Sequence, residues 1–379
     1  MTAKAAKGFV VDGFEPVREA FETSLQDGTE NGASFCVTKD GEPIIDLWGG
    51  YADPAETRPW EDNTIVNVYS TTKTMTFLVA LMLADRGELD FEAPVAKYWP
   101  EFAAEGKADL PVKYLMSHAA GLSGWRAPMT PQDLYDWEKA TSLLAAQAPL
   151  WEPGTASGYH AMTQGYLIGE VVRRITGDTI GTFFRREVAE PMKADFHIGL
   201  PASEDHRVAE LTPPSDGGIS QGPPNEIMVA TFGNPGIDVH ETKTRAWRGA
   251  EIPAAGGTGN ARSVALIHTI LANGGEIDGK RYLSEAMCRK PLETQIEGKD
   301  LVLGIPVRYG LGFGLSGEMS PAIHDEMMYW GGYGGSLILI DQKNRMTLSY
   351  VMNRMMPTTQ GDLRAITLAG KTWQSMHPA

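Results

Sequence analysis

The pattern of apolar and polar positions near the start of the chain predicts one helix and a β-hairpin. Apolar residues recur every four positions in residues 15–25, which is typical of a helix with one apolar face. Two β-type runs follow at residues 33–38 and 43–48, and Lys39, Asp40 and Gly41 join them. Because Asp-Gly is a strong hairpin turn signal, we expect these two runs to pair.

The rest of the chain is mainly helical in its middle and rich in strands at its end. Residues after Ser70, as far as Met82, are apolar on nearly all sides and predict a helix buried all round, with Gly87 at its C-terminal cap. Residues 94–192 read as mainly helical, and residues 212–236, rich in Pro and Gly, read as long loops. Further helices are expected at 261–273 and 362–373, and strands at 309–315, 327–330, 336–340 and 346–352.

Strands at both ends of the chain, with helices between them, predict an α+β fold. One antiparallel sheet, flanked by helices, would be built from residues 1–75 and 250–379. Residues 76–249 would form an inserted, mainly helical domain with long loops, and the active site would lie where the two parts meet.

Composition and charge exclude several function classes. The chain has 33 basic and 48 acidic residues, a net charge of −15, so nucleic acid is not an expected partner. No run reaches the ~20 apolar residues of a membrane span, and the N-terminus has no apolar core of a signal peptide. We therefore expect a cytoplasmic protein that does not bind membranes. Cys36 and Cys288 are predicted to be buried free thiols rather than a disulfide.

A Ser-x-x-Lys motif, Ser70-Thr71-Thr72-Lys73, stands at the start of the buried helix. Residues three apart share a helix face, so the Lys73 amine can reach the Ser70 hydroxyl. The positive end of a helix and an apolar wall both oppose an ammonium group and should lower the pKa of Lys73. A neutral amine could then accept the serine proton. The alternative is a serine helix cap followed by a solvated lysine.

A second nucleophile motif, Gly-x-Ser-x-Gly, occurs around Ser220. In α/β-hydrolases this motif joins a strand to a helix. Here two prolines precede it and two follow it, so we interpret Ser220 as a residue of a surface loop.

The ordered motifs of this chain resemble those of the serine β-lactamase and penicillin-binding-protein superfamily, and more narrowly class C β-lactamases and family VIII carboxylesterases. The resemblance covers nearly the whole chain. Besides Ser70–Lys73, it rests on residues 115–122, on the segment Trp-Glu-Pro-Gly-Thr-Ala-Ser-Gly-Tyr that ends at Tyr159, on residues 255–263, and on Trp330-Gly331-Gly332 near the C-terminus.

The resemblance implies a role for each matching residue. Ser70 would be acylated, Lys73 would share its proton network, and Tyr159 would act as general base and then as acid toward the leaving group. The oxyanion hole would consist of the backbone N–H groups of Ser70 and Tyr333. Trp330, Gly331 and Gly332 would contact the substrate, and Trp125 is a further candidate for substrate contact that does not rest on the resemblance. No cofactor and no metal are expected, because the chain has no metal-binding spacing of histidines or cysteines.

Two departures from the β-lactamase motifs predict the substrate. Trp330 stands where β-lactamases carry a lysine, and Ala161 stands where their second motif has an asparagine. A cation that binds a substrate carboxylate and an amide that binds a substrate amide are thus both absent. The hypothesis is therefore a serine hydrolase of small, uncharged carboxylic esters that acts through an acyl-enzyme.

Several alternatives remain open. They are a class C-like β-lactamase or D-amino-acid peptidase, an acyltransferase, and a non-catalytic scaffold of the same fold. His324-Asp325 leaves a Ser–His–Asp arrangement as a minor alternative, whereas His118 and His160 are interpreted as structural hydrogen-bonding groups. Tyr329 and Trp125 could line the pocket or belong to the core. The oligomeric state is not predicted.

Overall fold

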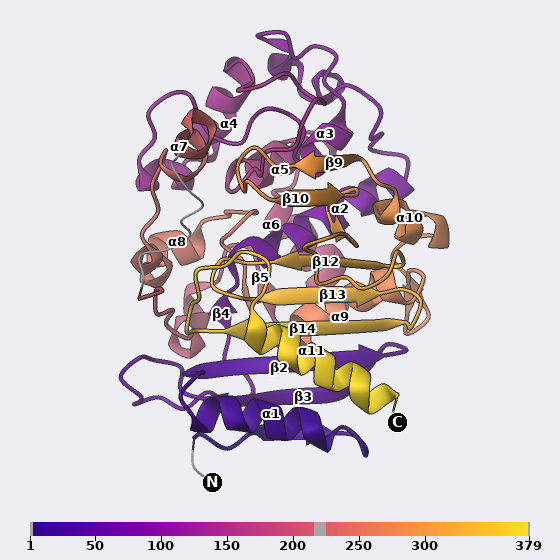
Figure 1. Ribbon diagram of the computed structural model, residues 1–379. Helices are drawn as coiled ribbons and strands as arrows, with labels where there is room; N and C mark the ends of the chain where they lie inside the picture. The colour runs from indigo at the N-terminus through magenta and orange to yellow at the C-terminus, as the bar shows by residue number, and fades with distance from the viewer. Residues whose placement is uncertain (1–2, 216–224, 378–379) are drawn as a thin grey trace.

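One antiparallel sheet forms the frame of the protein. The computed structural model describes residues 3–215 and 225–377. In these ranges the main sheet has the strand order β1-β3-β2-β14-β13-β12-β11-β10-β9, so strands from the two ends of the chain lie side by side (Figure 1). The strands are β1 (Lys7–Val10), β2 (Gly32–Lys39), β3 (Glu42–Gly50), β9 (Ile296–Lys299), β10 (Pro306–Tyr309), β11 (Gly314–Leu315), β12 (Met327–Gly331), β13 (Leu337–Asp341) and β14 (Met346–Met352).

The centre of the sheet is formed where the N-terminal hairpin meets the C-terminal strands. β14 pairs with β2 over seven residues, and every residue of β13 and β14 is buried. The β2–β3 hairpin turns through Asp40 and Gly41, both with positive φ, as the Asp-Gly signal predicted. The sheet is therefore closed by contacts between segments about 300 residues apart, which fixes the C-terminal strands against the start of the chain.

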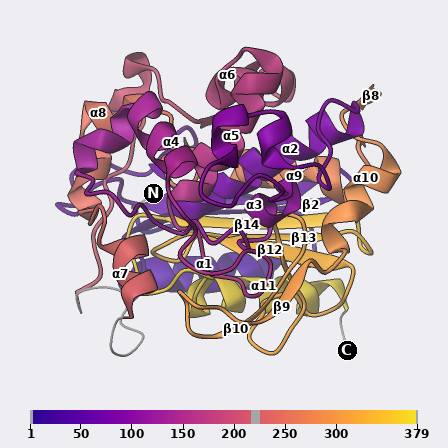
Figure 2. The same ribbon diagram turned by 90° about the horizontal axis from the view of Figure 1, so that it is seen from above.

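Helices cover both faces of the sheet. Helices α1 (Glu15–Gln26) and α11 (Leu363–Met376) lie on one face, and α9 (Ala261–Ala272) packs on the other against β2, β13 and β14 (Figure 2). Beyond α9, α2 (Lys73–Asp85) packs against α5 (Thr163–Thr176) and α6 (Ile180–Phe184). The remaining helices are α3 (Val112–Met116), α4 (Trp137–Ala146), α7 (Glu226–Phe232), α8 (Arg245–Gly249) and α10 (Glu285–Arg289).

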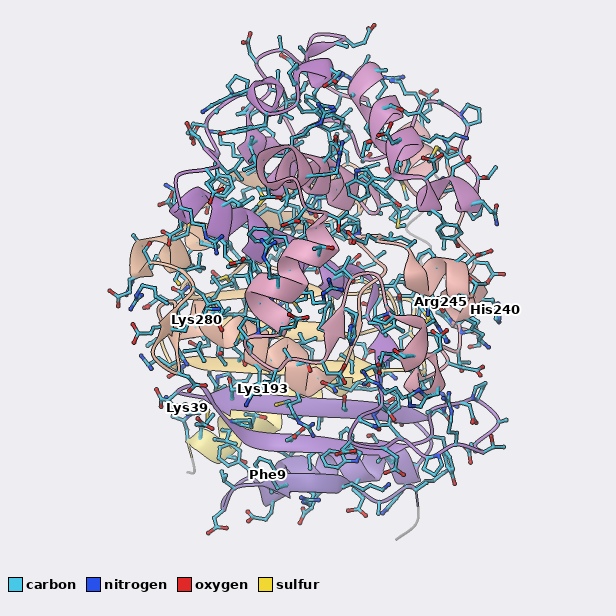
Figure 3. The ribbon with its side chains drawn as sticks, turned by 180° about the vertical axis from the view of Figure 1, so that it is seen from behind. Phe9, Lys39, Lys193, His240, Arg245 and Lys280 are labelled. Carbon is cyan, nitrogen blue, oxygen red and sulfur yellow. The ribbon has the colours of Figure 1, made fainter. Side chains whose placement is uncertain are left out.

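The predicted fold class is confirmed as a β-lactamase/transpeptidase-like α+β fold, with three local corrections. The single strand expected at residues 309–315 is interrupted, because β10 ends at Tyr309 and β11 begins at Gly314. Residues 212–236 were expected to be loops, but α7 lies within them; the Asn225 side chain caps its N-terminus by accepting a hydrogen bond from Met228 N–H. Strands β1 and β9 were not expected, because both are short, contain glycine and are largely exposed, as Phe9 on β1 shows (Figure 3). The proposed domain boundaries at residues 75 and 250 stay predictions, and Ser220 lies outside the described residues.

The structure bears on the predictions for the two cysteines and for membrane-spanning segments. Cys36 and Cys288 are both free and buried, as predicted. None of the helices formed by residues 3–215 and 225–377 is long and apolar enough to cross a membrane.

A buried ion pair ties the C-terminal helix to the N-terminal part of the sheet domain. Arg364, at the start of α11, donates a hydrogen bond from Nη1 to Glu30 Oε2 (3.1 Å), and Tyr350 OH also donates to the Glu30 carboxylate. Arg364 donates further bonds to the carbonyl oxygens of Arg354 (2.9 Å) and Gly334 (3.1 Å). Glu30 is 3% exposed and Arg364 is 8% exposed, and burial raises the pKa of Glu30 to about 8 although the guanidinium opposes this shift.

We expect Arg364→Met to lower the free energy of unfolding by about 3–5 kcal/mol, because it removes a buried guanidinium and leaves its acceptors on Glu30, Asp362, Arg354 and Gly334 without a partner. Urea denaturation of purified protein measures this loss. Arg345→Met is the control: Arg345 pairs with Asp40 at the surface, both side chains are more than half exposed, and the loss should stay within about 1 kcal/mol. Equal unfolding midpoints for the two variants would contradict the expectation.

Candidate active site

Ser70 lies in a tight turn between a short strand and a buried helix. The chain leaves β4 (Val66–Asn67), forms a 3-10 turn over Tyr69–Thr72, and enters α2 at Lys73. Tyr69 has a φ of +45°, a left-handed conformation that non-glycine residues adopt rarely and that clusters at functional sites. The helix therefore begins just after the serine, close to the predicted position.

The Lys73 amine is fully buried and bound to three oxygens. Nζ lies 3.0 Å from Ser70 Oγ, 2.7 Å from the carbonyl oxygen of Ala161 and 2.9 Å from that of Ala254. None of these three partners carries a charge. Burial therefore holds the pKa of Lys73 well below its ordinary value, as the sequence led us to expect.

The Tyr159 side chain, in the segment between α4 and α5, also binds the Ser70 hydroxyl. Its OH donates a hydrogen bond to Ser70 Oγ at 2.5 Å, and its ring lies 4.9 Å from Lys73 Nζ. Its backbone N–H donates to Asp300 Oδ1 at 3.0 Å, which anchors the segment. Burial raises the pKa of Tyr159 above its ordinary value, so the side chain is a neutral phenol at rest. The structure thus brings together the three residues that the motifs singled out.

The two histidines next to the motifs have structural partners. His160 Nε2 accepts from Leu122 N–H (3.1 Å), so its Nδ1 carries the hydrogen that is donated to Gly158 O (2.6 Å). His118 Nδ1 accepts from His160 N–H. Burial lowers the pKa of His160 to about 3 and that of His118 well below its ordinary value. Both rings are neutral hydrogen-bonding groups, as interpreted from the sequence.

The glycine segment after β12 approaches the Ser70 turn with its backbone. A Cβ atom at Gly332 would lie 3.3 Å from Ser70 N and would clash with Val68 O. Only glycine allows the two backbones to come this close. Tyr333, the next residue, packs its ring against Tyr69 with the centroids 5.5 Å apart. Gly332 therefore serves this close approach, whereas a Cβ atom at Gly331 would clash with the backbone of Thr359 and Gln360.

A hollow of about 320 Å³ opens directly above Ser70. None of the described side chains that line it is ionised at neutral pH, and its walls are mostly apolar. Helix α7 contributes one side of the hollow. The lining residues are Tyr69, Ser70, Tyr159, Ala161, Met162, Thr231, Phe232, Pro235, Ile237, Ala255, Tyr333 and Thr359.

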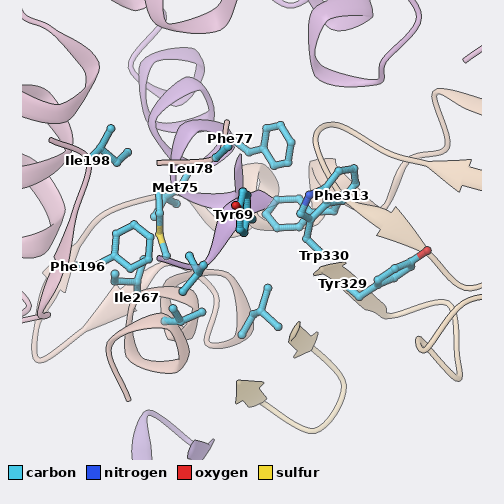
Figure 4. Close-up of a cluster of buried hydrophobic side chains, with 14 of the residues drawn as sticks. Tyr69, Met75, Phe77, Leu78, Phe196, Ile198, Ile267, Phe313, Tyr329 and Trp330 are labelled. Carbon is cyan, nitrogen blue, oxygen red and sulfur yellow. The ribbon is translucent and has the colours of Figure 1, made fainter. Parts of the chain in front are cut away.

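Trp330 lies behind Tyr159 rather than in this hollow. Its indole stacks on the His118 ring at 5.3 Å and meets the Phe77 ring edge-on at 5.6 Å, within a cluster of buried apolar side chains (Figure 4). It lines a narrow side space together with Tyr159, Gly331 and Tyr329. Trp330 was expected to contact the substrate, but it does not line the hollow. Its indole packs beside the Tyr159 ring instead.

Trp125 and His324 are both placed away from Ser70. Trp125 is a core residue: it is 2% exposed, and its Nε1 donates to the carbonyl oxygen of Ala140. The substrate contact expected for it is not found. His324 precedes β12 at the end opposite Gly331, and it binds Asp341 rather than Asp325. The Ser–His–Asp alternative is therefore wrong.

Sequence reasoning missed several groups that build the site. The carbonyl oxygens of Ala161 and Ala254 carry no signal in residue identity, because any residue could supply them. Asp300 was missed because its partners are backbone N–H groups from Tyr159 and from the turn at Val302 and Leu303. For α7, the capping residue Asn225 was the available signal.

Known proteins are similar to this chain in both sequence and fold. The Beta-lactamase family model matches residues 17–371. The chain is 36% identical over 368 residues to the esterase/beta-lactamase LipL of Mycobacterium tuberculosis. The matched region covers 90% of this chain and 82% of that protein. A family VIII carboxylesterase structure is 42% identical with a TM-score of 0.92, over 98% of this chain and 99% of its own. A penicillin-binding protein homolog from Caulobacter crescentus is 36% identical with a TM-score of 0.93, over the same shares of the two chains. This chain therefore belongs to the Beta-lactamase family, within the superfamily of serine β-lactamases and penicillin-binding proteins.

Proposed function

We propose that the protein is a carboxylesterase that hydrolyses small, uncharged esters through an acyl-enzyme on Ser70. The observation that carries this proposal is the meeting of a hydroxyl, a buried amine and a phenol beneath a hollow lined by no ionised side chain. The names of two relatives, an esterase/beta-lactamase and a family VIII carboxylesterase, support the same reaction class. The unpaired Cys36 and Cys288 support action in a reducing compartment, which we take to be the cytoplasm.

Lys73 is the general base in this mechanism. A neutral amine has two hydrogens and one lone pair. The carbonyl oxygens of Ala161 and Ala254 accept the two hydrogens, so the lone pair faces Ser70 Oγ. The amine takes the Ser70 proton as Oγ attacks the ester carbonyl. This assignment differs from the expected base role of Tyr159, because burial keeps that phenol protonated.

Tyr159 acts as the acid in this scheme. Its OH lies 2.5 Å from Ser70 Oγ, where the leaving alcohol departs after acylation. The phenol gives its proton to the alkoxide and regains one from the Lys73 ammonium, whose Nζ lies beside the ring. In the second half of the reaction Tyr159 passes its proton to the Lys73 amine as it takes one from the attacking water, and the Lys73 ammonium returns a proton to Ser70 Oγ when the acid leaves.

The negative charge of the tetrahedral intermediate would be bound by the backbone N–H groups of Ser70 and Tyr333. Both residues line the hollow, and Gly332 allows the two backbone segments to meet there. Ala161 contributes a methyl group to the hollow, and Trp330 adds no charge nearby. An ester needs neither an amide partner nor a cation, whereas penicillins and peptides carry a carboxylate that would bind no ionised side chain of this lining.

Ser70→Ala should lower ester hydrolysis about 10³-fold or more, because the nucleophile is lost. The measurement compares hydrolysis of p-nitrophenyl acetate and butyrate with that of a chromogenic cephalosporin. Ser220→Ala is the control and should keep wild-type rates. Faster turnover of the cephalosporin than of the esters would favour the β-lactamase alternative. Loss of activity in Ser220→Ala but not in Ser70→Ala would identify Ser220 as the nucleophile.

The rate should rise with pH, because the neutral form of Lys73 is the active form. Burial lowers the pKa of Lys73, so most of this rise falls below the ordinary lysine value of about 10.4. On the acidic side kcat/KM should fall about tenfold per pH unit. At alkaline pH it should stay level, since burial raises the pKa of Tyr159.

A pH profile of kcat/KM for p-nitrophenyl butyrate tests this expectation. Lys73→Arg is the informative variant, because a guanidinium stays charged at every pH of the profile and should be inactive throughout. Activity in Lys73→Arg, or a wild-type rate that declines steadily from neutral to mildly alkaline pH, would rule out the amine as base.

Phe232→Ser should reduce the preference for longer acyl chains, because Phe232 lines the hollow from α7. Two extra methylenes in butyrate against acetate are worth about tenfold when fully buried, so we expect the butyrate-to-acetate ratio of kcat/KM to fall about threefold. Val229→Ser is the matched control, since Val229 lies on the same helix, is exposed and does not line the hollow. An equal change in both variants would refute the role of Phe232.

A further inference from the structure

Ser336 connects the two backbone segments that the proposed mechanism needs to hold together. It lies between the glycine segment and β13 and is 1% exposed. Its Oγ donates a hydrogen bond to the carbonyl oxygen of Val68 at 2.9 Å. Since that bond uses its only hydrogen, Oγ accepts the hydrogen of Thr71 Oγ1, also at 2.9 Å. One side chain thus binds the residues on either side of the Tyr69–Ser70 pair.

The backbone of Ser336 binds the other segment. Its carbonyl oxygen accepts a hydrogen bond from Gly332 N–H at 2.9 Å, so Ser336 closes the tight loop that presents Tyr333. Gly335 N–H donates back to Gly332 O at 3.1 Å within the same loop. Ser336 is therefore bonded to the Ser70 turn through its side chain and to the Tyr333 loop through its main chain.

The Ser70 turn needs such external bonds. Its residue Tyr69 is held at positive φ, and the start of the 3-10 turn has no side-chain cap. Thr71 N–H reaches Val68 O at a long 3.3 Å, which is the same oxygen that the Ser336 hydroxyl binds. A strained turn persists only where its surroundings determine its conformation, and the Ser336 hydroxyl supplies two of these bonds.

We propose that Ser336 is a positioning residue that sets the distance between the Ser70 and Tyr333 N–H groups of the oxyanion hole. The inference rests on the proposed function, because it assigns these two groups to the transition state. Pre-organised donors act only when they are held at the position of the developing oxyanion. A hydroxyl bonded to Val68 and Thr71, within the loop of Gly332, holds the nucleophile turn and the strand loop at one spacing.

The test compares Ser336→Ala with wild type in ester hydrolysis and in covalent labelling. We expect kcat for p-nitrophenyl butyrate to fall about 10²-fold with KM little changed, since only the transition state uses the oxyanion donors. Binding of a trifluoromethyl ketone, whose adduct with Ser70 presents an oxyanion, should weaken by a similar factor. A residue with a structural role alone would lower the melting temperature and leave both quantities unchanged below it.

Two further variants separate the hydroxyl's contacts from its burial. Ser349→Ala, on the neighbouring strand β14, removes a buried hydroxyl that has no hydrogen-bond partner, and it should keep wild-type kcat. Thr71→Val removes the bond to Ser336 from the other side, and Thr71→Ser restores it. Combined with Ser336→Ala, Thr71→Val should add little further loss, because both act through one pair. If the fold loss of kcat in the double variant equals the product of the losses in the two single variants, the proposal is overturned.

Labelling by a fluorophosphonate, followed by intact mass, distinguishes the possible failures. It requires a nucleophilic Ser70, its rate depends on the oxyanion donors because negative charge develops on the phosphoryl oxygen, and it does not depend on the natural acyl donor. If the wild type is not labelled at Ser70, the proposed function fails, and the Ser336 inference fails with it. If the wild type is labelled and Ser336→Ala is labelled at the same rate, the Ser336 inference alone is wrong.

Discussion

The burial of one amine determines how the rest of this site is built. Lys73 lies on a helix whose side chains are buried on every face, and none of the three oxygens bound to its Nζ belongs to a carboxylate. Burial favours the neutral amine of a lysine over the ammonium, and the hydrogens of that amine still need acceptors. The carbonyl oxygens of Ala161 and Ala254 meet that need, and they come from two segments that are far apart in the sequence and that the fold brings to α2.

These two acceptors also explain why the neighbouring segments are packed backbone against backbone. Gly165, one turn into α5, would carry a Cβ only 2.4 Å from Ala254 N, so this position must be glycine for the carbonyl of Ala254 to reach the amine. Thr76 on α2 donates to the carbonyl oxygen of the adjacent Pro253 at 2.8 Å, which fixes the same segment. The direction of two peptide planes thus decides where the lone pair of Lys73 points.

How far the sequence predicts the site depends on whether a contact is local and belongs to a side chain. Ser70 and Lys73 were predictable, because a helix brings residues three apart onto one face. Tyr159 was predictable from its lead-in motif and the resemblance. The backbone acceptors of Lys73 were not, and neither was the core position of Trp125, since an aromatic residue near a motif suits a pocket wall and a core equally. The sheet was predicted through its long apolar strands, whereas the short, exposed β1 and β9 depend on pairing with neighbours.

Trp330 links the choice of substrate to the choice of base. A lysine at this position would place a cation beside the Tyr159 phenol, and a nearby cation favours the phenolate. Here the neighbours of the phenol are the Trp330 indole, 6.2 Å away between ring centroids, and the neutral His118 ring at 5.1 Å. These uncharged neighbours bury the Tyr159 phenol, and this burial raises its pKa. They also pack against its ring. In the mechanism we propose, the replacement that removes a cation for a substrate carboxylate thus also disfavours the phenolate of Tyr159, and it assigns the deprotonation of Ser70 to the buried amine of Lys73.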